Sequence, residues 1–323
     1  MREGKVKKMD NTNKMKMKFR AHETFFIRKG WLSKGMRYIE KTDGEVFVSK
    51  SENPVDILGL GTNMVKALRY WLVATELTTE ETSGKRIQKF TDIGKLIYEN
   101  DRFLEEIGTL HLLQYKLACS EENATAWYYF FNHFNLSDFD VNDFVQEIQK
   151  WIKEKKGEDE DVSKKLRSLT DDFNCIINTY FAKQETEKKS PENNIDCPLN
   201  ELNLIGISNK QKKTYRKTTP SINQFNPYIA LGIILDFAKE KSELQLNSLL
   251  QDEKSIGKIF NLDSISLIEV LRKVEKIGEL KIIRTAGLDV IQLANPNMEL
   301  IDCVKKYYSE ISNIENVKTG VDL

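Results

Sequence analysis

The 323-residue chain is 40% apolar and 30% charged, and its 49 lysines and arginines are balanced by 49 aspartates and glutamates. This composition is typical of a globular protein and excludes a disordered chain, and the length allows two or three domains. A formal net charge of zero excludes a nucleic-acid surface spread over the whole molecule. Any such surface has to be a local basic patch.

The N-terminal residues 1–18 are basic and lack the apolar core of a secretory signal. We interpret them either as a flexible basic arm or as a frayed, solvated tail. No apolar run reaches the roughly 18 residues that cross a bilayer. The four cysteines are not at metal-ligand spacing from one another, which indicates reduced thiols. The sequence therefore predicts a cytoplasmic protein without a membrane partner.

Residues 19–101 are predicted to form an N-terminal winged-helix domain, with the motif itself from Asp56 to Asn100. A short apolar stretch and a turn through Gly59 and Gly61 precede a helix over 63–74 with one apolar face. A hairpin with its tip at 82–84 follows, and then a further helix over 91–100.

In a winged helix the second helix enters the major groove of DNA and the hairpin contacts phosphates. The alternatives are a winged helix used for protein contacts and a helical core with ordinary solvated cations. The side chains predicted to contact DNA are Asn63, Lys66, Arg69, Tyr70, Lys85, Arg86 and Lys89.

The segment 19–32 carries the residue types that phosphodiester hydrolysis needs. That reaction requires a base that activates water, or a metal held by carboxylates, together with cations that stabilise charge on phosphorus. His22 is the predicted base, and Glu23 is a second base or a ligand of Mg²⁺ or Mn²⁺. Arg28 and Lys29 are the predicted phosphate clamp. The alternative is a capped helix start anchored by a buried histidine.

Two regions without obvious chemistry follow. Residues 102–156 are aromatic and helical, and the run 127–134 is interpreted as core, with base stacking as the alternative. Residues 157–220 are predicted to be a polar linker, because their charged stretches cannot bury enough apolar surface to fold. One helix, over 166–181, is expected to dock within this linker.

Residues 221–306 are predicted to form a C-terminal winged-helix domain, and 307–323 a frayed tail. Helices are expected over 227–239, 244–250 and 264–277, followed by a hairpin over 280–293. The third helix carries a mixed set of charges, so DNA contact and partner docking or dimerisation both stay open. The predicted fold class is mainly α with small β-hairpins (α+β), with two winged helix-turn-helix domains joined by a helical region and polar linkers.

Five short motifs together resemble one bacterial family, the "domain of unknown function 4007" proteins. The likeness is close over residues 18–152 and loose over the remainder. The motifs are Phe19-Arg20-Ala21-His22-Glu23-Thr24-Phe25, Arg28-Lys29-Gly30-Trp31-Leu32, the stretch from Leu58 to Lys66, Arg69-Tyr70-Trp71-Leu72 and Ala124-Thr125-Ala126-Trp127-Tyr128.

The family includes the nicking subunit of a single-stranded DNA phosphorothioation (Ssp) anti-phage system. The resemblance implies a DNA-binding component that nicks double-stranded DNA, so that sulfur can replace a non-bridging phosphate oxygen. It also implies three partners, namely a cysteine desulfurase, a sulfurtransferase of the phosphoadenosine phosphosulfate reductase type and an ATPase. The alternative is a non-enzymatic winged-helix adaptor or transcriptional regulator. The catalytic assignments above rest on side-chain chemistry and not on this resemblance.

Overall fold

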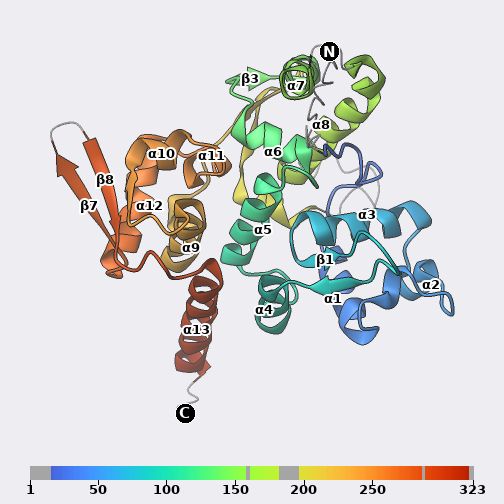
Figure 1. Cartoon of the computed structure of the whole chain (residues 1–323), viewed down its shortest axis with the longest axis horizontal. Helices are drawn as coiled ribbons and strands as arrows, with labels where there is room; N and C mark the ends of the chain where they lie inside the picture. The colour runs from blue at the N-terminus through green and yellow to red at the C-terminus, as the bar shows by residue number, and fades with distance from the viewer. Residues whose placement is uncertain (1–15, 158–160, 182–195, 286–287, 320–323) are drawn as a thin grey trace, which may run out of the picture.

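The computed structural model describes residues 16–157, 161–181, 196–285 and 288–319 of the chain. Helix α5 (Ile107–Cys119) lies at the centre, between the elements of residues 31–100 on one side and those of residues 227–293 on the other (Figure 1). The architecture is mixed, with many helices and small antiparallel sheets, as the sequence predicts. Most of the predicted N-terminal arm, residues 1–15, lies outside the described residues.

The N-terminal elements follow the predicted order of helices and hairpin. They are α1 (Trp31–Lys41), η1 (Glu45–Phe47), α2 (Pro54–Leu58), α3 (Thr62–Ala74), β1 (Thr78–Glu80), β2 (Gln88–Phe90) and α4 (Asp92–Asn100). Gly59 ends α2 with a left-handed φ of 59°, a conformation that glycine adopts without strain. Helices α1 and α3 pack so closely at Gly35 that a Cβ there would lie only 2.7 Å from Leu72 Cδ1.

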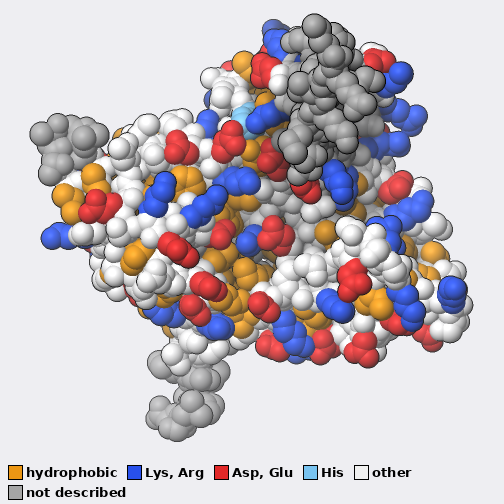
Figure 2. Space-filling model, viewed as in Figure 1, with side chains coloured by type: hydrophobic (Ala, Val, Ile, Leu, Met, Phe, Trp, Pro, Cys, Tyr) orange, Lys and Arg blue, Asp and Glu red, His pale blue; other side chains and the backbone are white. Residues whose placement is uncertain are grey.

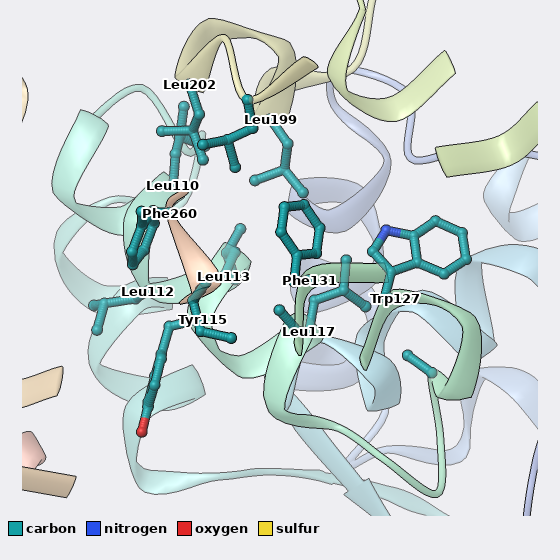
Figure 3. Packing of buried hydrophobic residues seen from close by; sticks show 14 of the residues in the cluster. Leu110, Leu112, Leu113, Tyr115, Leu117, Trp127, Phe131, Leu199, Leu202 and Phe260 are labelled. Atoms are coloured by element: carbon teal, nitrogen blue, oxygen red, sulfur yellow. The ribbon is translucent and has the colours of Figure 1, made fainter. Parts of the chain in front are cut away.

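The middle of the chain forms a bundle whose core is aromatic. Its elements are α5, α6 (Thr125–Asn132), β3 (Asp138–Phe139), α7 (Val141–Lys156), η2 (Val162–Lys165) and α8 (Leu166–Tyr180). Residues 127–131 are all at most 3% exposed, which confirms their interpretation as core. Trp127 and Phe131 of α6 face Leu113 and Leu117 of α5 in this core (Figure 3).

The prediction of a polar linker is wrong for the described residues 196–217. This segment folds into η5 (Pro198–Leu202), β4 (Ile205–Asn209) and β5 (Thr214–Lys217), and the sheet has the order β3-β5-β4. The physical reason is that a few leucines, Leu199, Leu202 and Leu204, are fully buried and anchor an otherwise polar segment. Backbone hydrogen bonds from β5 to β3 and to β4 then satisfy the polar backbone groups of these strands. The charged stretch 182–194 lies outside the described residues.

The C-terminal elements include the three predicted helices and the predicted hairpin. They are η6 (Ile222–Gln224), α9 (Pro227–Ala238), β6 (Glu243–Gln245), α10 (Leu246–Gln251), α11 (Ile256–Ile259), α12 (Ser264–Lys276), β7 (Leu280–Thr285), β8 (Leu288–Leu293) and α13 (Leu300–Thr319). Strand β6 was not predicted; it pairs with β8 and gives the sheet order β6-β8-β7. The β7–β8 hairpin projects from the edge of the molecule (Figure 1).

The prediction of a frayed tail over 307–323 is also wrong as far as Thr319, because α13 continues through these residues. Tyr307 and Tyr308 are buried against the start of α5. The hydroxyl of Tyr307 accepts a hydrogen bond from the backbone N–H of Gly108, and that of Tyr308 bonds the hydroxyl of Thr109. These two hydrogen bonds fasten α13 to the first turn of α5. Within the described ranges, every helix is too short or too polar to cross a membrane.

Candidate functional site

The predicted catalytic segment begins with a tight turn over residues 20–24. Arg20, Glu23 and Thr24 have positive φ angles of 55°, 49° and 69°, a left-handed conformation that side chains other than glycine adopt at a cost. The backbone N–H of Phe25 donates to the carbonyl of His22 at 2.8 Å and closes the turn. The turn buries His22 and leaves Glu23 partly exposed.

Both ring nitrogens of His22 are engaged inside the protein. Its Nε2 lies 2.7 Å from Oδ1 of Asp172, and its Nδ1 accepts the backbone N–H of Thr24 at 3.1 Å. Because Nδ1 accepts, Nε2 carries the hydrogen and donates it to the carboxylate. The ring is stacked on Trp71 and meets Trp127 edge-on. In this arrangement His22 anchors the turn and has no ring nitrogen open to a water.

Asp172, the partner of His22, is a residue that sequence reasoning missed. Its Oδ1 also accepts the backbone N–H of Arg20 at 2.9 Å. Burial raises the pKa of Asp172 above its ordinary value, although the hydrogen bond from His22 acts in the opposite direction. A signal was present, because Asp172 lies on the apolar face of α8, between Leu169 and Ile176. A carboxylate at such a position indicates a buried partner.

The other predicted catalytic side chains diverge from His22. The Glu23 side chain is 37% exposed, and its Oε1 lies 3.9 Å from Nζ of Lys66 on α3. The Arg28 guanidinium lies against the rings of Phe25 and Trp31, at 5.6 and 5.3 Å from their centroids. Lys29 is exposed. The structure therefore brings Glu23 to the predicted DNA-binding helix and places His22 in the core.

Two predicted DNA-contacting arginines converge on one carboxylate. Nε of Arg69 lies 2.6 Å from Oε2 of Glu80, and a terminal nitrogen of Arg86 lies 2.5 Å from Oε1. Burial alone would raise the pKa of Glu80, but the hydrogen bonds and charges of the two arginines outweigh it and lower the pKa. This cluster ties α3 to β1 and to the loop between β1 and β2.

The predicted lysines also have acidic partners. Lys85 pairs with Glu45 at 3.2 Å and Lys89 with Glu81 at 3.6 Å, and both lysine side chains are well exposed. Positive and negative side chains are interspersed over the face drawn in Figure 2. The predicted basic patch therefore exists only as a set of ion pairs.

The last two predicted contact residues differ in exposure. Asn63 is exposed, and its Oδ1 accepts a hydrogen bond from Nζ of Lys66 at 3.3 Å. Tyr70 is half-buried, because its ring packs on Trp71 with 4.9 Å between centroids. Asn63 is thus available to a ligand, whereas most of Tyr70 belongs to the packing around His22.

Glu23, the predicted ligand of Mg²⁺ or Mn²⁺, has few other metal-ligating side chains around it in the part of the chain that the structure describes. Among the described residues, no three His, Cys, Asp or Glu side chains lie close enough together to hold a metal ion. Glu23 is paired with a lysine, and a cation so close disfavours a second one. The described residues around Glu23 do not fit a metal cage made by the protein alone.

Known proteins show the same fold. The family model described as "Protein of unknown function (DUF4007)" matches residues 19–308. Two solved structures, described as "SspB crystal structure" and "Magnesium ion-bound SspB crystal structure", are 24% and 25% identical to this chain. Each superposes with a TM-score of 0.77 and covers 90% of this chain and 88% of its own. No curated protein is significantly similar to the chain.

Proposed function

The chain belongs to the DUF4007 family, and from that premise we propose that it is a component of a bacterial DNA phosphorothioation anti-phage system. The proposal is supported by the likeness to SspB, which extends over 90% of the chain. It is also supported by the resemblance of residues 18–152 to a family with a DNA-nicking subunit. Its partners would be the desulfurase, the sulfurtransferase and the ATPase that this resemblance implies.

The finer proposal is that α3 and the β1–β2 hairpin bind double-stranded DNA as a winged helix. The order of helix, glycine turn, helix and hairpin supports it. The acidic partners of Lys66, Lys85 and Lys89 do not prevent binding, because an exposed ion pair contributes only about 0–1 kcal/mol. Phosphates replace the carboxylates, and the release of counterions drives this exchange. Residues 227–293 hold α9, β6, α10, α11 and α12 ahead of the β7–β8 hairpin, and this succession of helices and a hairpin supports a second winged helix.

For nicking, the observation that carries the proposal is the pairing of Glu23 with Lys66. Water attacks the phosphorus and gives its proton to Glu23, while the bond from phosphorus to one bridging oxygen breaks and that oxygen leaves with a proton from solvent. Lys66, together with Lys29, neutralises the phosphate oxygens. His22 has a positioning role, because it holds the turn that presents Glu23. Arg28 supports the same segment through its stacking on Phe25 and Trp31.

The test is nicking of supercoiled plasmid, with Mg²⁺ present because one structural relative is described as magnesium-bound. Glu23→Gln keeps the size of the side chain and removes the base, so nicking is expected to fall by about 10²-fold or more. Glu99→Gln is the matched control, because Glu99 is also exposed and also pairs with a lysine, on α4. Equal nicking by wild type and Glu23→Gln would refute the role of Glu23.

A second function is favoured by the burial of His22 and the engagement of both its nitrogens. In this alternative the chain binds DNA and delivers it to partner enzymes without cleaving it. A gel shift in rising salt then shows steep weakening, while the purified chain leaves the plasmid supercoiled. Nicking by the wild-type chain excludes this alternative.

A further inference from the structure

A pocket of about 450 Å³ lies where the end of α6 meets β5 and the corner between α10 and α11. Its lining includes three cations, Arg216, Lys217 and Lys258, and one carboxylate, Asp138. Asp138 lies 3.5 Å from Nε of Arg216, which also donates a hydrogen bond to Ser208. The charge of the two lysines is left without an opposite charge in the lining.

Lys217 is held in place by the end of a helix. Its Nζ donates hydrogen bonds to the carbonyls of Phe130 at 2.5 Å and Phe134 at 2.6 Å, where α6 ends. Its ammonium also lies 4.8 Å from the centroid of the Phe130 ring. An ammonium has three donors. In the described part of the chain, these two carbonyls are the hydrogen-bond acceptors of Lys217, so one N–H is left for a ligand.

Lys258 brings a second positive charge to the same pocket. Its Nζ donates to Oδ1 of Asn135 at 3.0 Å, and among the described residues neither lysine has a carboxylate within ion-pair distance. Burial and the charge of Lys258 together lower the pKa of Lys217 to about 7. Two positive charges held close together without a counter-charge repel each other, and the attraction of both to a bound anion would offset that repulsion.

The position of Lys258 is fixed by close packing of the backbone. A Cβ at Gly257 would lie 2.6 Å from both the Cα and the carbonyl oxygen of Leu250. Only glycine therefore lets α11 approach the end of α10 this closely. The hydroxyl of Ser255 accepts the backbone N–H of Lys258 and caps the same short helix. The backbone of Lys258 therefore lies in the tightly packed corner between α10 and α11. A backbone fixed in this way before binding is typical of preorganised ligand sites.

We propose that this pocket binds the phosphate group of a nucleotide-sized ligand. Lysine and arginine are the side chains that bind phosphate, and Arg216 with Lys258 would contact the oxygens from two sides of the pocket. The pocket volume lies within the range of small-molecule sites, about 300–1,000 Å³. The site does not depend on the function proposed for Glu23.

The first test is calorimetric titration of the full-length chain with 5′-dAMP, inorganic phosphate and deoxyadenosine. Binding of 5′-dAMP and phosphate, but not of the nucleoside, is expected. Lys258→Ala is expected to weaken binding about tenfold or more, which corresponds to about 1.4 kcal/mol. Lys212→Ala is the matched control, because Lys212 is exposed in the β4–β5 turn and does not line the pocket. The absence of phosphate binding, or equal binding by Lys258→Ala, Arg216→Ala and wild type, overturns the proposal.

A second test identifies the source of the phosphate. If the ligand is the end of a DNA strand, a 5′-phosphorylated oligonucleotide displaces 5′-dAMP and its 5′-hydroxyl counterpart does not. If the ligand is a free nucleotide, neither oligonucleotide displaces it. Isotope-labelled lysine gives an independent readout by NMR. A bound anion is expected to raise the pKa of Lys217, and an unchanged pKa in the presence of saturating 5′-dAMP overturns the proposal.

Discussion

Nε2 of His22 and Oδ1 of Asp172 lie 2.7 Å apart in the interior, although 150 positions separate the two residues in the chain. The pair joins the N-terminal turn to α8. Since Oδ1 of Asp172 also accepts the backbone N–H of Arg20, one oxygen fixes both the ring and the backbone of the turn. The position of Glu23 beside Lys66 therefore depends on a residue in a distant helix.

Two substitutions of Asp172 should separate its role as a hydrogen-bond acceptor from the role of its charge. Asp172→Ala leaves the N–H groups of His22 and Arg20 without an acceptor, and each lost bond is expected to cost about 1–3 kcal/mol of unfolding free energy. Asp172→Asn keeps an oxygen at the same place and should cost much less. Chemical denaturation measures both variants. An equal loss of stability in the two would show that the oxygen is not what holds the turn.

The same carboxylate predicts a pH dependence. Because the folded-state pKa of Asp172 is raised above its ordinary 3.8, the folded protein holds this proton more tightly than the unfolded chain does. The associated stability is present at low pH and is lost as pH rises through the folded pKa. The stability of Asp172→Asn relative to wild type is therefore expected to increase as pH rises above 3.8. A constant difference across that range contradicts the prediction.

Lys217 predicts a pH dependence of the opposite sign at higher pH. Its pKa is lowered from 10.5 to about 7, so between these values the unfolded chain binds more protons than the folded protein. The free energy of unfolding then rises with pH over this window. Lys217→Met should remove that slope between about pH 7 and pH 9. Denaturation midpoints of wild type and Lys217→Met at several pH values measure this slope. Parallel plots of unfolding free energy against pH for the two proteins would contradict the prediction.

Glu80 should restrain DNA binding if α3 and the hairpin form the interface. Glu80→Gln removes the charge that holds Arg69 and Arg86, so both guanidinium groups become available to phosphates. The affinity for duplex DNA in a gel shift is expected to rise. The slope of the logarithm of the binding constant against the logarithm of salt concentration is expected to become steeper by about one for each new phosphate contact. Glu99→Gln serves as the control for added net charge. Weaker binding by Glu80→Gln would indicate that the arginines need Glu80 for their orientation.

The sequence predicted those elements whose signals are local. Gly59 and the apolar face of the following helix located α2 and α3, and the Gly84 tip located the hairpin. The η5–β5 segment was missed because three buried leucines, Leu199, Leu202 and Leu204, are too few to form a periodic pattern. The acidic partners of the predicted cations were missed for another reason. Pairing across a fold depends on tertiary packing, which local spacing does not encode.

The tyrosine contacts of α13 set an order of events during synthesis. Tyr307 and Tyr308 bond residues at the first turn of α5, about 200 positions earlier in the chain. A ribosome releases α5 long before these tyrosines emerge, so the start of the central helix remains uncovered while most of the protein is already made. The nascent chain therefore forms these contacts only after α13 leaves the exit tunnel, and a premature stop before Tyr307 leaves Gly108 and Thr109 without their tyrosine partners.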